Sequence, residues 1–178
     1  EKLYCSENDD NIQVGERLFF TNENGKIIDY LRSLIKDDDY YSLSSLLYKV
    51  SVHNNTSGVF KGFYKDTETN KGQFGGNAKN ALKRITKTIE LSYPIFFKNQ
   101  CQTIVKQKDT NILVKDIENE NIDITYYDPP YNEHPYGSNY FMLNCIAKNK
   151  EPKTISKVSG IPIDWNKSNY NKKILAIE

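Results

Sequence analysis

Hydrophobic residues recur at helical spacing in the first third of the chain. The first set consists of Ile27, Ile28, Leu31, Leu34 and Ile35. The solvent-exposed side of this helix is expected to carry Lys26, Asp29, Arg32 and Lys36. This set predicts a helix that Thr21 can cap with its side-chain oxygen. A second helix, which should end in the polar cluster 54–58, is predicted by Leu43, Leu46, Leu47 and Val50.

The pattern changes to β-branched and apolar runs after residue 103. Two short runs, 104–105 and 112–114, predict strands, and the run 122–127 predicts a central parallel strand because it is nearly continuous and ends in turn residues. A central parallel strand is typical of open α/β sheets, so we expect the α/β class. We therefore expect residues 1–57 and 104–178 to form one domain.

The first part of residues 58–103 shows neither the periodicity of a helix nor that of a strand. Five of the nine glycines lie between Gly58 and Gly76, interleaved with aromatic residues and lysines. A basic helical stretch follows, with Ala81, Leu82, Ile85 and Ile89 inward and Lys79, Lys83, Arg84 and Lys87 outward. We interpret this region as an insertion that presents a basic, aromatic-bearing surface for recognition, although composition alone favours an ordinary solvated loop with a surface helix.

Length and charge set the scale of the protein. The 178 residues, 38% of them hydrophobic, suffice for one domain with a core. The formal net charge is only +1, but it is unevenly distributed: residues 1–39 carry five basic and ten acidic side chains, whereas residues 61–115 carry eleven basic and four acidic. One face or lobe is therefore expected to be basic.

Several classes of protein are excluded by what the sequence lacks. Three cysteines without close spacing support neither a disulfide framework nor a zinc knuckle. No apolar run approaches the roughly 20 residues that a membrane span needs, and no signal segment opens the chain. His53 and His134 have no ligand partner at a suitable spacing, so no metal site is predicted. A cytoplasmic protein is expected.

The segment after the strongest predicted strand carries the candidate chemistry. Pro129 and Pro130 hold Asp128 extended and lack N–H groups, so the Asp128 carboxylate and the Pro129 carbonyl are acceptors with no donor between them. This arrangement suits a ligand with two N–H donors, such as the amino group of adenine. Tyr131 adds an aromatic face on which an unstacked base could lie. The alternative is an ordinary turn aspartate.

These residues resemble a known family. The stretch Asp128-Pro129-Pro130-Tyr131-Asn132 resembles the DPPY motif of N6-adenine DNA methyltransferases, which use S-adenosylmethionine. The segments 134–144, 17–24 and 55–58 are similar to segments of a restriction-modification subgroup, in the same order. The resemblance implies a Rossmann-like methyltransferase, here partial, that acts on duplex DNA. It also implies that Asp128 and the Pro129 carbonyl bind adenine N6 while Tyr131 stacks on the flipped base.

The resemblance implies roles for further residues. Asp116, after the predicted strand 112–114, would contact the cofactor adenine, or it is a surface carboxylate at a strand end. The base pocket and the DNA interface would include Asn132, Asn139, Tyr140, Asn55, Thr56, Lys61, Lys79, Lys83, Arg84 and Lys87. Tyr140 could equally belong to the core, and the basic residues could form a solvated face.

One departure from the family pattern affects the functional prediction. The aromatic-x-Gly-x-Gly cofactor loop should precede residue 1, and Phe74-Gly75-Gly76 lacks the preceding strand that such a loop needs. We therefore expect a central fragment or one part of a split enzyme, with a complementary segment or chain carrying the loop. A non-catalytic DNA-binding fragment and a methyltransferase acting on RNA or a protein amide are the alternatives. Asp rather than Asn before Pro-Pro-Tyr argues against protein amides.

Overall fold

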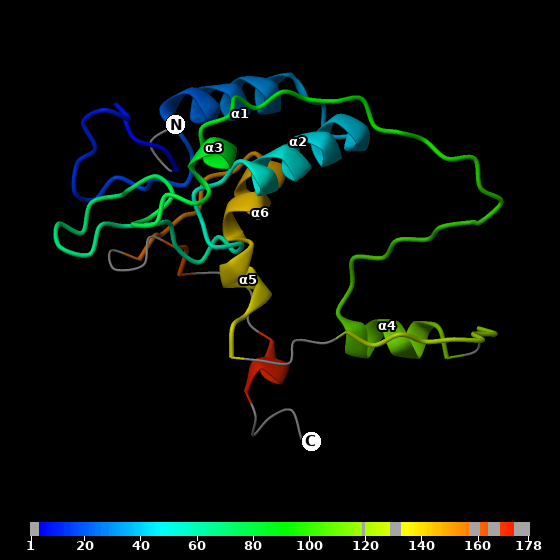
Figure 1. Cartoon of the computed structure of the whole chain (residues 1–178). Coiled ribbons are helices and arrows are strands. Elements are labelled where there is room, and N and C mark those ends of the chain that lie inside the picture. Colours follow the sequence, from blue (N-terminus) through cyan, green and yellow to red (C-terminus); the bar gives the residue numbers. More distant parts are fainter. Residues whose placement is uncertain (1–3, 119, 129–132, 157–160, 164–167, 173–178) are drawn as a thin grey trace. The chain divides into compact units, whose positions relative to one another are not determined.

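The computed structural model divides the chain into two units, and it describes residues 4–118, 120–128, 133–156, 161–163 and 168–172. One unit comprises Glu1–Pro94 and Pro130–Glu178, and the other comprises Ile95–Pro129. The first contains α1 (Asn22–Leu34), α2 (Tyr40–Val52), α3 (Leu82–Ile85), α5 (Tyr136–Asn139), α6 (Phe141–Lys148) and the 3-10 helix η1 (Asn169–Asn171), and the second contains α4 (Thr110–Asp116) (Figure 1).

The two predicted N-terminal helices are confirmed. Thr21 caps α1 by accepting a hydrogen bond from the Asn24 N–H at 3.2 Å. Asp39 caps α2 in the same way, through the Ser42 N–H at 3.0 Å. In both cases a side-chain oxygen satisfies a backbone donor that the first helical turn leaves without a partner. The helices therefore begin where short-range sequence signals place them.

The hydrophobic core of this unit is built by α1, α2 and α6 together with the chain before α1. Phe19 and Phe20 have no exposed surface, and the Phe19 ring meets Phe141 of α6 edge-on with centroids 5.7 Å apart. Edge-to-face packing of this kind adds to the gain from burying apolar area. Further buried members of the cluster are Tyr4, Ile28, Leu46, Val50, Phe60, Met142 and Ile146.

Residues 58–94 pack on this core. Phe60 and Ile89 are buried in it, and Ile85 is fully buried. Asn24 of α1 fixes the end of the segment, because its amide oxygen accepts from the Ile89 N–H at 2.9 Å and its amide nitrogen donates to the Lys87 carbonyl at 3.0 Å. The predicted basic helix is confirmed only over the four residues of α3. The division between the two units lies after residue 94.

The predicted strands are wrong for this structure. Residues 112–114 lie in α4, which Asp109 caps through the Asn111 N–H at 2.9 Å. Neither 104–105 nor 122–127 is a strand, and β-pairing in the described part is limited to isolated bridges. A strand needs hydrogen bonds from a neighbouring strand, and residues 120–128 find no such neighbour among the described residues. The described part accordingly contains no Rossmann-like sheet.

The described residues contain neither a candidate membrane-spanning helix nor a metal-binding cluster. Within those ranges no helix combines the length and the apolar content that a membrane crossing needs. The same part of the chain contains no group of three or more His, Cys, Asp or Glu residues placed to hold a metal ion.

Candidate functional site

Along the chain, the division between the two units falls within the proposed catalytic motif, after Pro129. Asp128 is exposed and lies outside regular secondary structure. Pro129, Pro130, Tyr131 and Asn132 lie outside the described residues, so the pair of acceptors inferred from the sequence has no described geometry. The site is therefore characterised by the chain that follows the motif.

The segment that follows the motif is held by hydrogen bonds within the first unit. Pro135 precedes α5, and its carbonyl accepts from the buried Ser138 through both the backbone N–H (3.0 Å) and the hydroxyl (2.9 Å). The Asn139 carbonyl accepts from the Phe60 N–H at 2.7 Å. Because Phe60 is a core residue, this backbone hydrogen bond connects the segment that follows the motif to the hydrophobic core.

Two of the proposed base-pocket residues lie in this segment. Tyr140 is 41% exposed and packs its ring against Tyr136 with centroids 5.9 Å apart, so it is not a core residue. The side-chain oxygen of Asn139 is buried and has no hydrogen-bond partner in the described part of the chain. An acceptor without a donor is costly when it is buried. Both side chains therefore remain candidates for contact with a substrate.

Asn55 and Thr56 do not have the surface position that a DNA contact requires. Asn55 is fully buried, and its amide nitrogen donates to the carbonyls of Leu18 (2.9 Å) and Gln73 (3.2 Å). Its amide oxygen accepts from the Gly75 N–H at 2.9 Å. Asn55 therefore joins three segments of one unit. Thr56 is 2% exposed and donates to the Asn54 amide oxygen. These side chains stabilise the fold, because the polar atoms of a buried side chain need hydrogen-bond partners within the protein.

The same hydrogen bonds explain Gly75 and Gly76. Both have positive φ, 75° and 63°, a region that glycine adopts without steric cost. The Gly75 N–H is bound to Asn55, and a Cβ on Gly76 would lie 3.1 Å from the Tyr64 ring. These glycines therefore form a tight turn that is held by Asn55 and packs against Tyr64.

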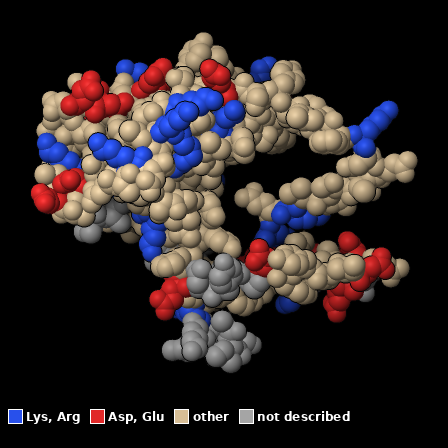
Figure 2. Space-filling view, viewed as in Figure 1, with Lys and Arg blue, Asp and Glu red and all other residues tan. Residues whose placement is uncertain are grey.

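The predicted basic residues separate into two groups. Lys61, Lys79, Lys83 and Lys87 are exposed, and Figure 2 shows lysine and arginine side chains near the position of α3. Arg84 is only partly exposed, contrary to the prediction. It donates to the carbonyl oxygens of Val52 and Asn54, the latter at 3.0 Å. Because α2 ends at Val52, Arg84 satisfies one carbonyl that the helix end leaves without a partner and a second one two residues further on.

Asp116 does not occupy the position that the sequence predicted. It is the last residue of α4 rather than the residue after a strand, and its carboxylate pairs with Lys108. Its side chain is 48% exposed. An exposed carboxylate that already has a lysine partner does not fit a closed cofactor-adenine site, so only the family resemblance supports that role.

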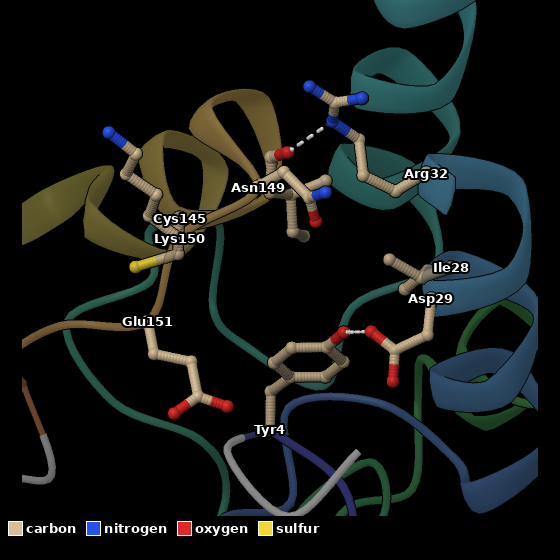
Figure 3. A pocket seen from close by; sticks show the side chains of 9 residues that line it. Tyr4, Ile28, Asp29, Arg32, Cys145, Asn149, Lys150 and Glu151 are labelled. Carbon is tan, nitrogen blue, oxygen red and sulfur yellow. Dashed lines mark hydrogen bonds between the residues drawn. The ribbon is translucent and has the colours of Figure 1, made fainter. Parts of the chain in front are cut away.

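A cavity that the sequence did not predict lies between α1 and the end of α6. It has a volume of about 230 Å³, and its lining includes Tyr4, Asp29, Arg32, Cys145 and Glu151. The Tyr4 hydroxyl donates to the Asp29 carboxylate, and Arg32 points to the C-terminal end of α6 (Figure 3). The cavity joins polar groups from three segments, which helical spacing alone could not reveal.

The sequence predicted Arg32 on the solvent-exposed side of α1, but the residue is only 5% exposed. Its guanidinium donates to the carbonyls of Ile146 (2.9 Å), Ala147 (3.1 Å) and Ile35 (2.8 Å). Arginine has five N–H donors, so it can close the ends of two helices at once. Arg17 is half-buried, and this burial lowers the pKa of its guanidinium.

Comparison with known proteins gives a consistent set of matches. The family described as D12 class N6 adenine-specific DNA methyltransferase matches residues 7–175. The modification methylase StsI of Streptococcus sanguinis is 32% identical over 172 residues, which are 90% of this chain and 23% of that protein. The type II methyltransferase M.NlaIII of Neisseria lactamica is 35% identical over 142 residues, 74% of this chain and 37% of that protein.

A third relative extends the set beyond bacteria. The type II methyltransferase M.CviAII of Paramecium bursaria Chlorella virus 1 is 32% identical over 170 residues, 89% of this chain and 44% of that protein. The chain thus spans between about a quarter and less than half of the length of these relatives. No solved structure matches the chain.

Proposed function

The chain belongs to the family of D12 class N6 adenine-specific DNA methyltransferases, and we propose that it provides the target-base and DNA-recognition part of such an enzyme. The proposed reaction transfers a methyl group from S-adenosylmethionine to N6 of a flipped adenine in duplex DNA, within a restriction-modification system. The observation that carries this proposal is the match over residues 7–175, which includes the motif 128–131. A Rossmann-like arrangement of the whole enzyme is part of the proposal and rests on the family alone.

Asp128 and Pro129 supply the acceptors in this proposal. The Asp128 carboxylate and the Pro129 carbonyl accept hydrogen bonds from the two N–H groups of the adenine amino group. These bonds draw the nitrogen lone pair out of conjugation with the ring and orient it for an in-line transfer. The negative charge of Asp128 also stabilises the positive charge that develops on N6.

The aromatic residues hold the base. A base that leaves the duplex loses its stacking, and a ring such as Tyr131 can return about 1–3 kcal/mol of that loss. Pro130 keeps the backbone extended between the two functional groups. Asn132, Asn139 and Tyr140 follow the motif and are proposed to complete the base pocket. The exposure of Tyr140 and the unpartnered oxygen of Asn139 support these two assignments.

Residues 58–103 are proposed to contact the DNA backbone. The exposed lysines 61, 79, 83 and 87 support this assignment, because phosphate contacts position a protein on a duplex. Arg84, Asn55 and Thr56 are left out, since their polar groups are used within the fold. The cofactor site is not assigned to Asp116, and no step is routed through that residue.

The proposal is tested by methyl transfer from labelled S-adenosylmethionine to unmethylated duplex DNA, using the full-length protein that contains this chain. Nucleoside analysis should show N6-methyladenine. Asp128→Ala should abolish transfer while leaving DNA binding largely intact, because the carboxylate acts on the base after the duplex is bound. The matched control is Asp123→Ala, an exposed aspartate five positions upstream, which should retain transfer.

The alternative function is a non-catalytic DNA-binding subunit of a split methyltransferase. In this alternative the chain binds DNA, and methyl transfer requires a complementary chain. DNA binding without transfer, restored to transfer by a complementary chain, would support it. Loss of DNA binding in Asp128→Ala with retained turnover would contradict both versions.

A further inference from the structure

A hollow in the first unit combines small residues with two asparagines. Its volume is about 340 Å³, and it is lined by Tyr64, Lys65, Gly75, Gly76, Asn77, Ala78, Asn80 and Ala81. The glycines and alanines among these residues carry no side chain longer than a methyl group, so the backbone of this segment stays accessible. A ligand can therefore approach the segment closely, within reach of both asparagines.

One buried residue holds two sides of this hollow. The Asn55 carbonyl accepts from the Tyr64 N–H at 3.2 Å, and the Asn55 amide oxygen accepts from the Gly75 N–H at 2.9 Å. Gly76 packs so closely on Tyr64 that a Cβ on this glycine would lie 3.1 Å from the ring. Tyr64 and the turn at Gly75 are thus held in place before any ligand arrives. A preformed site of this kind needs less ordering on binding.

Two asparagines of the lining have side chains that the fold does not use. Asn77 and Asn80 are exposed, and their side-chain amides have no hydrogen-bond partner in the described part of the chain. Asn55, in contrast, uses both ends of its amide inside the fold. An asparagine amide offers two N–H donors and an acceptor oxygen. Amides of this kind suit a ligand that presents a donor and an acceptor side by side.

The charge around the hollow favours a nucleic acid. No aspartate or glutamate is among the described residues that line it, and Lys79 is exposed between the two asparagines. Lys65 is also exposed, and its ammonium lies over the Phe63 ring, 5.2 Å from the centroid. The carboxylate of Asp66 accepts from the N–H and the hydroxyl of Thr69, both at 2.8 Å. Lysines beside a donor and acceptor surface match bases that are flanked by phosphates.

We propose that Asn77 and Asn80 form a base-reading site for the major-groove edge of an adenine in the recognition sequence. This inference rests on the proposed function, which assigns the neighbouring lysines to phosphates alone. The major-groove edge of adenine presents the N6 amino group as a donor beside the N7 acceptor, and one asparagine amide matches both. The adenine bound here differs from the flipped target base, which the motif at Asp128 binds.

Base reading and phosphate binding have different consequences. Loss of a phosphate contact weakens the reaction with all duplexes about equally, whereas loss of a base contact removes discrimination at one base pair. A bidentate contact contributes between about fivefold and about 150-fold to that discrimination. A side chain that only stabilises the fold would lower the amount of active protein without changing the ratio of rates between duplexes.

The experiment uses the full-length protein that contains this chain. Methylation of random duplexes, followed by sequencing of the products, first gives the recognition sequence of the wild type. Methylation rates are then compared between the recognition duplex and duplexes in which each base pair is replaced singly. In the double variant Asn77→Ala, Asn80→Ala, discrimination at one A·T pair should fall by about fivefold to about 150-fold. Discrimination at the other base pairs should be retained.

Isosteric and control variants separate base reading from an effect on folding. Asn77→Asp and Asn80→Asp keep the side-chain shape but remove the donor for adenine N7. The variant at the contacting residue should lose the preference for adenine and favour cytosine, whose N4 amino group donates to a carboxylate. Lys79→Gln should weaken methylation of all duplexes alike, as expected for a phosphate contact. Asn144→Ala, at an exposed asparagine of α6 outside the hollow, should leave every ratio unchanged.

The outcomes separate this site from the proposed function. Wild-type methylation at a defined sequence, with unchanged discrimination in the double variant, would overturn the base-reading site and leave the function standing. Equal weakening on all duplexes would also overturn it, because the asparagines would then contact phosphates. A wild-type protein that does not methylate DNA would overturn both proposals. Loss of discrimination at a single A·T pair, with an unchanged circular dichroism spectrum, supports the site.

Discussion

The two units of the chain contain similar hydrophobic residues in opposite environments. In the first, Phe19, Phe20 and Leu46 have no exposed surface, whereas in the second Phe97, Ile124 and Tyr126 are each more than four-fifths exposed. The difference is one of partners. Helices α1, α2 and α6 present apolar faces to one another, but α4 has no buried residue. Apolar residues stabilise a fold only where another apolar surface covers them.

The largest expected difference between the units lies in their apolar residues. Phe19→Ala should lower the free energy of unfolding by about 3–5 kcal/mol, because it leaves a cavity among tightly packed aromatic rings. Ile124→Ala in the second unit should change it by no more than about 0.5 kcal/mol. Chemical denaturation followed by circular dichroism measures both. Similar losses in the two variants would show that residues 122–127 are buried in solution.

Helix caps offer a smaller test of the same comparison. Thr21→Ala removes the acceptor for the Asn24 N–H and should cost about 1 kcal/mol of unfolding free energy. Asp109→Ala removes the corresponding acceptor of α4. It should fray that helix without affecting unfolding of the first unit, which hydrogen exchange can resolve by segment. A global loss of stability from Asp109→Ala would contradict the division into two units.

The smallest effect is expected at low pH. The Ser42 hydroxyl and the Ser42 backbone N–H donate to Asp39, which lowers the pKa of that carboxyl. A lowered folded-state pKa means that the stabilisation is present above the ordinary pKa of aspartate, about 4, and is lost as the pH falls through the folded-state value. Asp39→Asn should make the free energy of unfolding less dependent on pH in this acid range. Asp38→Asn, at an exposed neighbouring residue, should leave the pH dependence unchanged. Identical acid unfolding curves for wild type and Asp39→Asn would contradict this.

Prediction from sequence succeeded where the decisive contacts are local. The spacing of Ile28 and Leu31 and the cap at Thr21 lie within a few residues of one another, so α1 could be located. The family could also be recognised, because the segment 128–132 is a continuous motif. Strand 112–114 was wrong because a strand needs a distant partner, while the Asp109 cap gives a helix local support.

The amino-acid sequence by itself determined the N-terminal helices and the family, since each depends on residues that are close along the chain. Only the tertiary structure decided which polar side chains remain available for function. Asn55 and Arg32 are used inside the fold by carbonyl groups that other segments leave without partners. Lys61 reaches His134 across 73 residues. The physical reason is that a buried hydrogen bond must be satisfied by whichever segment packs nearby, and packing is not encoded in local spacing.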